Sequence, residues 1–286
     1  MDATLLRAFC DFVHEKAGIT LTEAKEPLIT ARLAKRLRTL GLADERQYLE
    51  VLKGPSGEDE LVHFLDAIST NFTSFFREPD HFEHVTEQVT AWLSHGRRKF
   101  RFWSVASSSG EEPYTLAMVL AEAFQGRDID YRILGTDIST RVLALARDAT
   151  YTGSQVERIP AHLRQRYFAR KTRGAAGGDT YQVVPALRQR TTFARLNLSA
   201  PPFPMAGPMD IVLCRNVMIY FDQPVRQALV GEIERVMAPG GLLMIGHSET
   251  LNGIRMGLRS VRASTFSKPA AGEPQRMHAP RAAAGR

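Results

Sequence analysis

Two adjacent carboxylates, Glu111 and Glu112, follow a run of small residues that extends from Ala106 to Gly110. Aromatic and branched residues before the run favour a buried strand, and apolar residues at three- and four-residue steps after it favour a helix. A strand, a tight loop of small residues and a helix form the first crossover of a doubly wound sheet, where nucleotide-like cofactors bind. Acidic side chains in this turn would repel a pyrophosphate and suit a cationic ligand.

The next strand of such a sheet is predicted at residues 131–136 and ends at Asp137. An acid at this place commonly holds ribose hydroxyls. The sequence contains neither a GxGxxG phosphate cradle nor a GxxxxGK[ST] loop. The acidic turn and the ribose-binding acid together indicate S-adenosylmethionine, which has a sulfonium, an amino group and no phosphate, and therefore a methyltransferase. On this pattern alone, a nicotinamide or another nucleotide is the alternative ligand.

A second set of polar residues is interleaved with phenylalanines after the fourth predicted helix. Asn71, Thr73 and Arg77 belong to this set. Aromatic side chains at this density are normally core, so they would hold the polar groups at the edge of an apolar wall. An isolated Arg77 would be expected to pair with Glu78 or Asp80 at the surface, but the whole set favours a binding site.

The elements that would position these residues divide the chain into predicted units. Residues 1–85 read as helical without a β-rich run, and residues 86–268 alternate strands and helices, which predicts an α/β sheet. Residues 152–190 are too irregular for a crossover helix and too apolar for a linker, so we predict a small insert with its own hairpin. Residues 261–268 are predicted to be one edge strand, and residues 269–286 a disordered tail.

Two later strands complete the predicted sheet. One returns the chain to the sheet and ends at Asn197 and Leu198, and a buried strand beginning at Met209 is followed by Arg215 and Asn216. Open α/β sheets place ligands at the carboxyl ends of their strands. The polar pair Arg215 and Asn216 is therefore a candidate for the same site as the acidic turn.

Composition limits the class of protein. The chain has 286 residues, of which 44% are apolar and 24% charged, as in ordinary globular proteins. Cys10 and Cys214 are far apart and lack metal-ligand spacing, so neither a disulfide framework nor a metal site is predicted. No apolar run approaches the roughly 20 residues that span a bilayer, and a secretory signal pattern is missing. We expect a cytoplasmic protein with no membrane insertion; a net charge of +6 permits an acidic partner.

The predicted second helix carries a basic exposed side formed by Arg32, Lys35, Arg36 and Arg38. A basic helical face is most often only solvated. The functional alternative is a docking surface for an acidic helical partner or for nucleic acid.

Taken together, these stretches resemble the CheR-type chemoreceptor glutamate methyltransferases of bacterial chemotaxis. The matching motifs occur in the family's order between residues 5 and 267, and they are RLAKRLRTLGL, TNFTSFFREPDHF, WSVASSSGEEPYTLAM, TDIS, LNL, CRNVMIYFD and GGLLMIGHSE. The resemblance implies an all-helical N-terminal domain, a Rossmann-like seven-stranded S-adenosylmethionine-dependent methyltransferase sheet and a small antiparallel β-subdomain inserted before the third strand. It also implies transfer of methyl groups to receptor glutamates, forming methyl esters in chemotaxis adaptation.

The resemblance also implies roles for individual residues. Asp137 would hold the ribose, one of Glu111 and Glu112 the methionine end, and Asn197 and Leu198 the adenine side. The remaining implied cofactor contacts, from the linker and from behind the methionine moiety, are Asn71, Thr73, Arg77, Arg215 and Asn216.

The same resemblance places Arg77 and Tyr220 beside the transferring methyl group, and no metal is implied. Receptor methylation regions are glutamate-rich helices, which the basic second helix could steer, and a receptor C-terminal peptide could bind at the β-subdomain. The loop RGAAGG in the insert does not clearly match the family's peptide-binding pattern. A nucleic-acid substrate is disfavoured because the phenylalanines read as buried. A methyltransferase for RNA or a small molecule and a non-catalytic cofactor-binding regulator are the rival interpretations.

Overall fold

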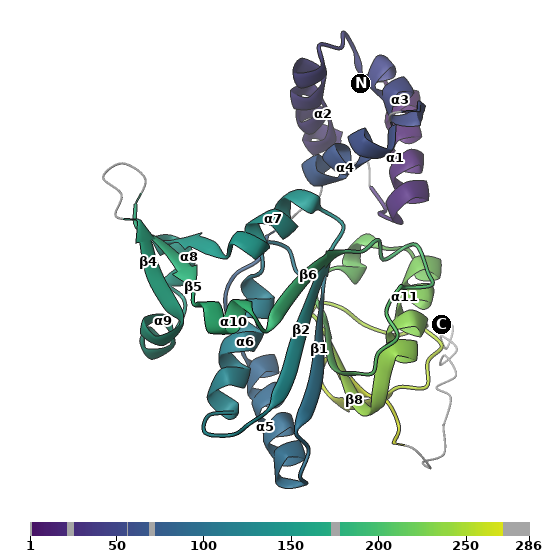
Figure 1. Ribbon diagram of the computed structural model, residues 1–286. Helices are drawn as coiled ribbons and strands as arrows, with labels where there is room; N and C mark the ends of the chain where they lie inside the picture. The colour runs from purple at the N-terminus through teal and green to yellow at the C-terminus, as the bar shows by residue number, and fades with distance from the viewer. Residues whose placement is uncertain (1, 22–25, 56, 69–71, 173–177, 271–286) are drawn as a thin grey trace.

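The protein is seen here in a computed structural model (Figure 1). It describes residues 2–21, 26–55, 57–68, 72–172 and 178–270. The predicted disordered tail lies outside the described residues from residue 271 onward.

The N-terminal region is a bundle of helices, as its periodicity predicted. Asp2 accepts the Leu5 N–H at 2.7 Å and begins the first helix, and Gly18, at φ 67°, ends it in the left-handed conformation that favours glycine. The bundle encloses a core that includes Phe9, Leu33 and Phe64. Its helices are α1 (Ala3–Ala17), α2 (Glu26–Leu40), α3 (Glu45–Lys53) and α4 (Gly57–Ile68).

The rest of the chain is built on a seven-stranded sheet of order β6-β2-β1-β7-β8-β10-β9. The five strands from β6 to β8 run parallel, and β10 and β9 complete the sheet as antiparallel neighbours. The single edge strand predicted over residues 261–268 is therefore wrong, because a turn at Ser264 folds this part of the chain into a hairpin. The strands are β1 (Lys99–Val105), β2 (Asp130–Asp137), β6 (Thr191–Arg195), β7 (Met209–Cys214), β8 (Met237–Ile245), β9 (Arg259–Arg262) and β10 (Thr265–Ser267).

Helices cover both faces of this sheet, as Figure 1 shows. Successive strand residues point to opposite faces, so Phe102 packs in the core beneath α5 and α6, whereas Trp103 packs in the core beneath α11. The covering helices are α5 (Asp80–Ser94), α6 (Glu111–Ala123), α7 (Thr140–Asp148), α10 (Pro185–Arg188) and α11 (Gln223–Val236). None of the described helices is long and apolar enough to cross a membrane.

The predicted insert forms a small antiparallel sheet of order β3-β5-β4, which begins at Thr150. It is anchored on the main domain by Tyr151, whose hydroxyl donates to the Ser109 carbonyl at 2.8 Å, and by Phe168, which packs edge-on against Phe75. Its elements are β3 (Thr150–Thr152), α8 (Gly153–Val156), α9 (Ala161–Tyr167), β4 (Phe168–Thr172) and β5 (Thr180–Val183).

Candidate active site

A cavity of about 1150 Å³, partly open to solvent, lies at the carboxyl ends of β1, β2, β6 and β7. Its walls come from the end of α1, the loop before α5 and the segments that follow these strands. This is the edge of an open α/β sheet at which ligands bind.

The cavity gathers nine of the residues that the sequence nominated. Glu111 is not among the described residues that line it, and Asn71 lies outside the described residues. The nine that line it are Thr73, Arg77, Glu112, Asp137, Asn197, Leu198, Arg215, Asn216 and Tyr220.

Asp137, at the end of β2, is fixed against the turn that follows β1. Its Oδ2 accepts the Ser108 N–H at 2.9 Å, and its Oδ1 accepts the Ser139 N–H at 3.0 Å. Burial raises the pKa of this carboxyl, and the backbone hydrogen bonds oppose the increase. Ala106 and Ser108 in the turn have φ 55° and 48°, a conformation that is uncommon outside glycine and clusters at functional sites. An ionised carboxylate has about four lone-pair sites, so Asp137 can still accept hydroxyl donors from a ligand.

The two adjacent glutamates face different parts of the molecule. Glu112 lines the cavity and accepts hydrogen bonds from the Ser104 hydroxyl at 2.7 Å and from Arg215 Nη1 at 2.9 Å. Glu111 is buried and accepts from Gln155 Nε2 of the insert at 3.3 Å. Burial raises the pKa of both carboxyls. The geometry thus favours Glu112 as the acid that meets a ligand, and Glu111 as a link to the insert.

Arg215 joins this turn to the loop before α5. Its side chain is 1% exposed, and its Nη2 donates to Glu78 Oε2 at 3.0 Å and to the Arg77 carbonyl. With Glu112 on Nη1 and the Phe82 ring 5.4 Å from its guanidinium carbon, the cation is enclosed on several sides. Burial raises the pKa of Glu78, but the charge and hydrogen bonds of Arg215 outweigh it and hold the pKa below its usual value.

Glu249, which the sequence analysis did not identify, holds the loop after β7 in place. Its carboxylate accepts four backbone N–H groups, from Asn216 at 2.8 Å, Val217 at 2.9 Å, Met218 at 2.8 Å and Gly246 at 2.7 Å. A Cβ at Gly246 would lie 2.5 Å from Asn216 Nδ2, so only glycine lets the two loops approach this closely. Glu249 is the last residue of the GGLLMIGHSE motif. An acidic residue shortly after a glycine at the end of a predicted strand is the sequence signal that could have identified it.

Glu78 was nominated only as a surface partner of Arg77, and the structure gives it a different partner. It pairs with Arg215, and its Oε1 accepts from Asn216 Nδ2 at 3.3 Å. Arg77 instead donates through Nη1 to the Phe72 carbonyl at 3.2 Å, and its side chain reaches the cavity wall.

The chain that follows α1 closes the cavity from the side of the helical bundle. The Thr20 N–H donates to the Tyr220 carbonyl at 2.8 Å, and Asn197 Nδ2 donates to the Lys16 carbonyl at 2.8 Å. Tyr220 stands in a short 3₁₀ helix, Met218–Tyr220, that follows the loop held by Glu249. The N-terminal helices are therefore part of the site, a contribution that local sequence patterns did not reveal.

Comparison with known proteins agrees with this geometry. Residues 71–266 match the family model for the CheR methyltransferase S-adenosylmethionine-binding domain, and residues 4–69 match the model for the CheR methyltransferase all-alpha domain. A chemotaxis protein methyltransferase of Escherichia coli is 36% identical over 92% of this chain and 90% of its own length. Chemotaxis protein methyltransferase 2 of Pseudomonas aeruginosa is 38% identical over 89% of each chain, and a probable chemotaxis protein methyltransferase of Rhizobium etli is 37% identical over 84% of this chain and 90% of its own. The chain belongs to the CheR family of S-adenosylmethionine-dependent methyltransferases.

Proposed function

We propose that this protein transfers a methyl group from S-adenosylmethionine to glutamate side chains of membrane chemoreceptors, forming methyl esters in chemotaxis adaptation. The observation that carries the proposal is the cavity at the strand ends, where Asp137 and Glu112 present carboxylates to a ligand. Relatives over most of the chain are named chemotaxis protein methyltransferases, which supports the receptor as substrate.

The hydrogen-bonding groups of the cavity suit S-adenosylmethionine. Asp137 would accept hydrogen bonds from the ribose hydroxyls, and Glu112 would accept a hydrogen bond from the amino group of the methionine end. Arg215 would act by holding Glu112, because its own donors are already engaged within the protein. Asn197 and Leu198 would border the adenine. The remaining proposed contacts in the cavity are Thr73, Arg77 and Asn216.

The reaction requires the protein to position the methyl donor and the acceptor, and it does not require a strong base. When bound, S-adenosylmethionine supplies an electrophilic methyl group on a cationic sulfonium. A glutamate side chain has an ordinary pKa of about 4.3, so the acceptor is already ionised at neutral pH. Opposite charges neutralise as the methyl moves, and water disfavours this step because it stabilises the separated charges. The apolar walls and the segment after α1 would exclude water and fix the angle of attack.

Arg77 and Tyr220 are the residues that we propose to orient the acceptor. Both line the cavity. A guanidinium can hold a carboxylate through charge-assisted hydrogen bonds, and a phenol can donate one more. The exposed ring of Phe72, whose carbonyl already accepts from Arg77, stands beside them at the mouth of the cavity.

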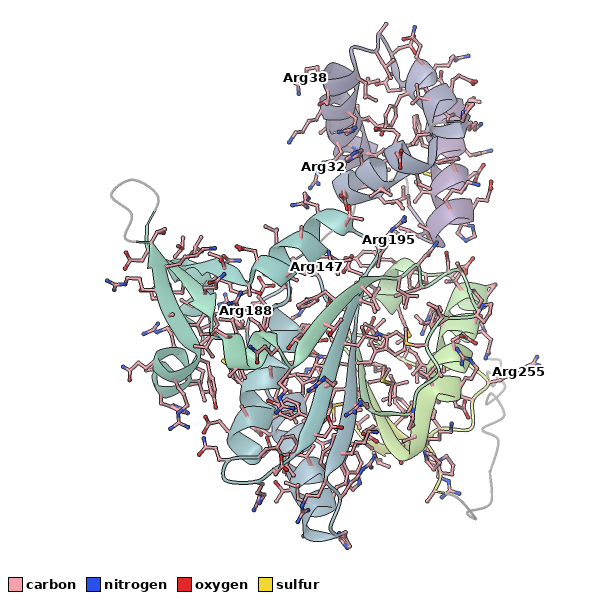
Figure 2. All side chains as sticks on the ribbon, viewed as in Figure 1. Arg32, Arg38, Arg147, Arg188, Arg195 and Arg255 are labelled. Atoms are coloured by element: carbon pink, nitrogen blue, oxygen red, sulfur yellow. The ribbon has the colours of Figure 1, made fainter. Side chains whose placement is uncertain are left out.

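Fewer residues belong to the basic surface that we propose to contact the receptor than the sequence suggested. Arg36 does not belong to it, because its guanidinium pairs inside the bundle with Glu60 at 2.6 Å. Arg32, Lys35 and Arg38 are exposed, and we call these three the basic docking face. Figure 2 shows Arg32 and Arg38 on the side of α2 that is turned toward the inserted β-sheet. A glutamate-rich receptor helix has the opposite charge and would be steered to this side of the molecule.

The inserted sheet offers an edge for a receptor C-terminal peptide. Within the described residues β4 pairs only with β5, and four of its five residues are exposed. An extended peptide can add to such an edge through backbone hydrogen bonds. The glycine loop that bears on this proposal lies largely outside the described residues.

The test is incubation of the purified protein with S-adenosylmethionine labelled on its methyl group and with receptor-containing membranes. Methyl esters on receptor-sized bands would release labelled methanol in mild base, whereas N-methyl groups on RNA would not. A matched incubation with Arg77→Ala at saturating cofactor controls for adventitious labelling. This variant loses one proposed cofactor contact, so it should bind the cofactor more weakly, and it should transfer the methyl group at least 100-fold more slowly even when saturated (about 2.7 kcal/mol). Base-stable label would favour the RNA or small-molecule alternative, and cofactor binding without transfer would favour the non-catalytic regulator.

A further inference from the structure

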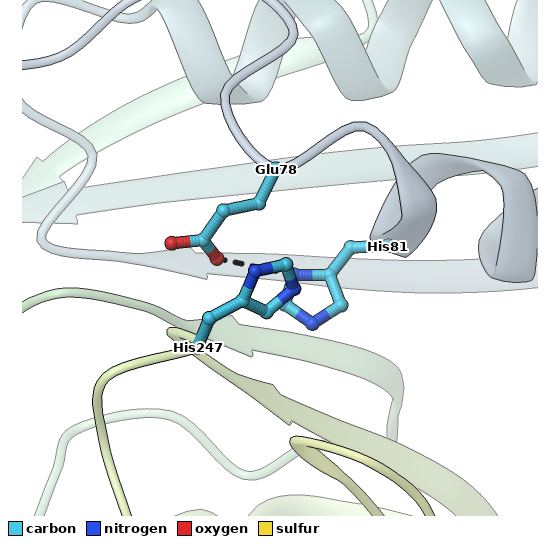
Figure 3. Close-up of side chains that lie close together, drawn as sticks. All are labelled: Glu78, His81 and His247. Atoms are coloured by element: carbon cyan, nitrogen blue, oxygen red, sulfur yellow. Dashed lines mark ion pairs between the residues drawn. The ribbon is translucent and has the colours of Figure 1, made fainter.

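Three potential metal ligands meet outside the cavity, between the start of α5 and the loop after β8. Glu78 precedes α5, His81 lies in its first turn, and His247 follows β8 (Figure 3). One ligand atom from each residue lies within 4.8 Å of the others. The two imidazole rings pack edge to face, 4.9 Å apart between centroids and inclined at 65°.

His81 makes no hydrogen bond through its side chain to any residue that the structure describes. Its side chain is 2% exposed, and within those residues neither Nδ1 nor Nε2 has a hydrogen-bond partner. Glu78 Oε2 lies 3.5 Å from Nδ1, which is too long for a good hydrogen bond. A buried polar atom without a partner costs about 1–3 kcal/mol, so the cluster lacks a group that His81 could bind.

The charge around His81 suits a divalent cation. The carboxylates of Glu78 and Asp80 lie close to His81, and the nearby cation is Arg215, which pairs with Glu78. Both ring nitrogens of His81 are buried and unpartnered among the described residues, so the ring can offer one of them to an ion. The cluster therefore combines a nitrogen donor with two nearby carboxylates.

The ligand types and their surroundings point to one class of metal. Two imidazoles and a carboxylate suit zinc and its neighbours in the transition series rather than magnesium or calcium. His247 Nε2 lies 3.0 Å from Asp80 Oδ2, the contact with a carboxylate that usually orients a metal-bound histidine. His247 is 48% exposed, which gives an ion a path from solvent.

We propose that Glu78, His81 and His247 bind one divalent transition-metal ion, with a water in the fourth position. Zinc-bound ligand atoms in a tetrahedral site are about 3.3 Å apart, so the exposed side chain of His247 would swing inward by about 1–2 Å on binding. The ion fastens the turn before α5 to the loop after β8. Because Glu78 in that turn holds Arg215, and Glu249 in that loop holds residues 216–218, the ion stiffens the wall of the cavity without touching the reacting groups.

The test is equilibrium dialysis of the full chain, freed of metal by a chelator, against Zn²⁺. One Zn²⁺ per chain is expected, and His247→Ala should weaken binding at least 100-fold. His95→Ala removes an exposed histidine at the opposite end of α5, away from the cluster, and should bind Zn²⁺ as the native protein does. Equal Zn²⁺ uptake by the native protein and His247→Ala would overturn the proposal.

Two further measurements guard against adventitious binding. Co²⁺ in this site should give the intense visible absorption of tetrahedral coordination, and that absorption should be missing in His247→Ala. Zn²⁺ should raise the Tm of the native protein and of His95→Ala but not of His247→Ala, because a ligand that binds only the folded state stabilises it. Asp80→Asn, which leaves all three ligands in place, should weaken Zn²⁺ about tenfold. An equal rise in Tm in all four proteins would show that the binding occurs elsewhere.

Discussion

Two arginine–glutamate clusters, one partly buried in the helical bundle and one with a fully buried arginine at the cavity, look alike in composition and differ in surroundings. In the bundle, Arg36 pairs with Glu60 through Nη2–Oε2 at 2.6 Å and Nε–Oε1 at 2.9 Å. The Tyr48 hydroxyl donates to the same carboxylate at 2.5 Å, and burial raises the pKa of that phenol. All three residues stand within regular helices.

At the cavity, Arg215 is held by Glu112 in the first turn of α6 and by two groups of the loop before α5, the Arg77 carbonyl and Glu78. Glu78 and Asn216, which contact each other, have φ 52° and 59°, and Phe76 before them has φ 54°. Such conformations cost about 1–3 kcal/mol each and persist only where the surrounding structure enforces them. The contrast teaches that a buried ion pair alone does not mark a binding site. What marks it is an ion pair that joins strained loops at the edge of a cavity.

The largest expected effect comes from removing the cation at the cavity. Arg215→Met keeps much of the side-chain volume but leaves Glu78 and Glu112 buried without their partner. Because Glu112 would lose its orientation, the affinity for S-adenosylmethionine should fall at least 100-fold, which is about 2.7 kcal/mol. Calorimetry on protein shown to be folded by circular dichroism measures this. Affinity within threefold of the native value would remove the cavity cluster from the site.

The matching change in the bundle should act on stability alone. Arg36→Met leaves Glu60 buried and unpaired, so the free energy of unfolding should fall by about 3 kcal/mol, measured in urea. The affinity for S-adenosylmethionine should be unchanged. Arg36→Met/Glu60→Leu should recover much of the loss, because an apolar pair replaces both charges. A tenfold loss of cofactor affinity in Arg36→Met would erase the distinction between the clusters.

The sequence predicted the sheet, the bundle and the insert, because these depend on local patterns, and nine of the residues that it nominated line the cavity. Asp137 and Arg215 could be nominated since each follows a strand, and parallel strands bring such ends together. The role of Glu78 could not be predicted from the sequence, because its partner Arg215 is 137 residues away in the chain. Arg36 was misplaced on the basic surface for a similar reason. Helical spacing cannot show that a long side chain folds back to Glu60 on another helix.

A smaller effect is expected from the carboxylate that holds the loop beside Arg215. Glu249→Gln replaces one acceptor oxygen with an amide that faces backbone N–H groups, so the loop through Met218 should loosen. The affinity for S-adenosylmethionine should fall about tenfold, equivalent to 1.4 kcal/mol. Glu234→Gln is the matched control, because Glu234 also accepts a backbone N–H, from Gly257 at 3.1 Å, but lies on α11 away from the cavity lining. Equal losses in the two variants would show that Glu249 has no special part in the site.

The smallest effect concerns pH and separates the two acids that share Arg215. Burial raises the pKa of Glu112 above its ordinary value, whereas for Glu78 the raising effect of burial is outweighed by Arg215, so its pKa is lowered. As pH falls, Glu112 therefore takes up a proton first, while Glu78 stays ionised and keeps Arg215 in place. Cofactor affinity should decline on an acid limb that begins above the ordinary pKa of a glutamate, by less than tenfold before Glu78 titrates. Calorimetry across this range should find a smaller acid limb in Glu112→Gln than in the native protein, because Asp137, whose pKa burial also raises, still titrates in the variant. A limb of equal amplitude in the two proteins would assign the titration to another group.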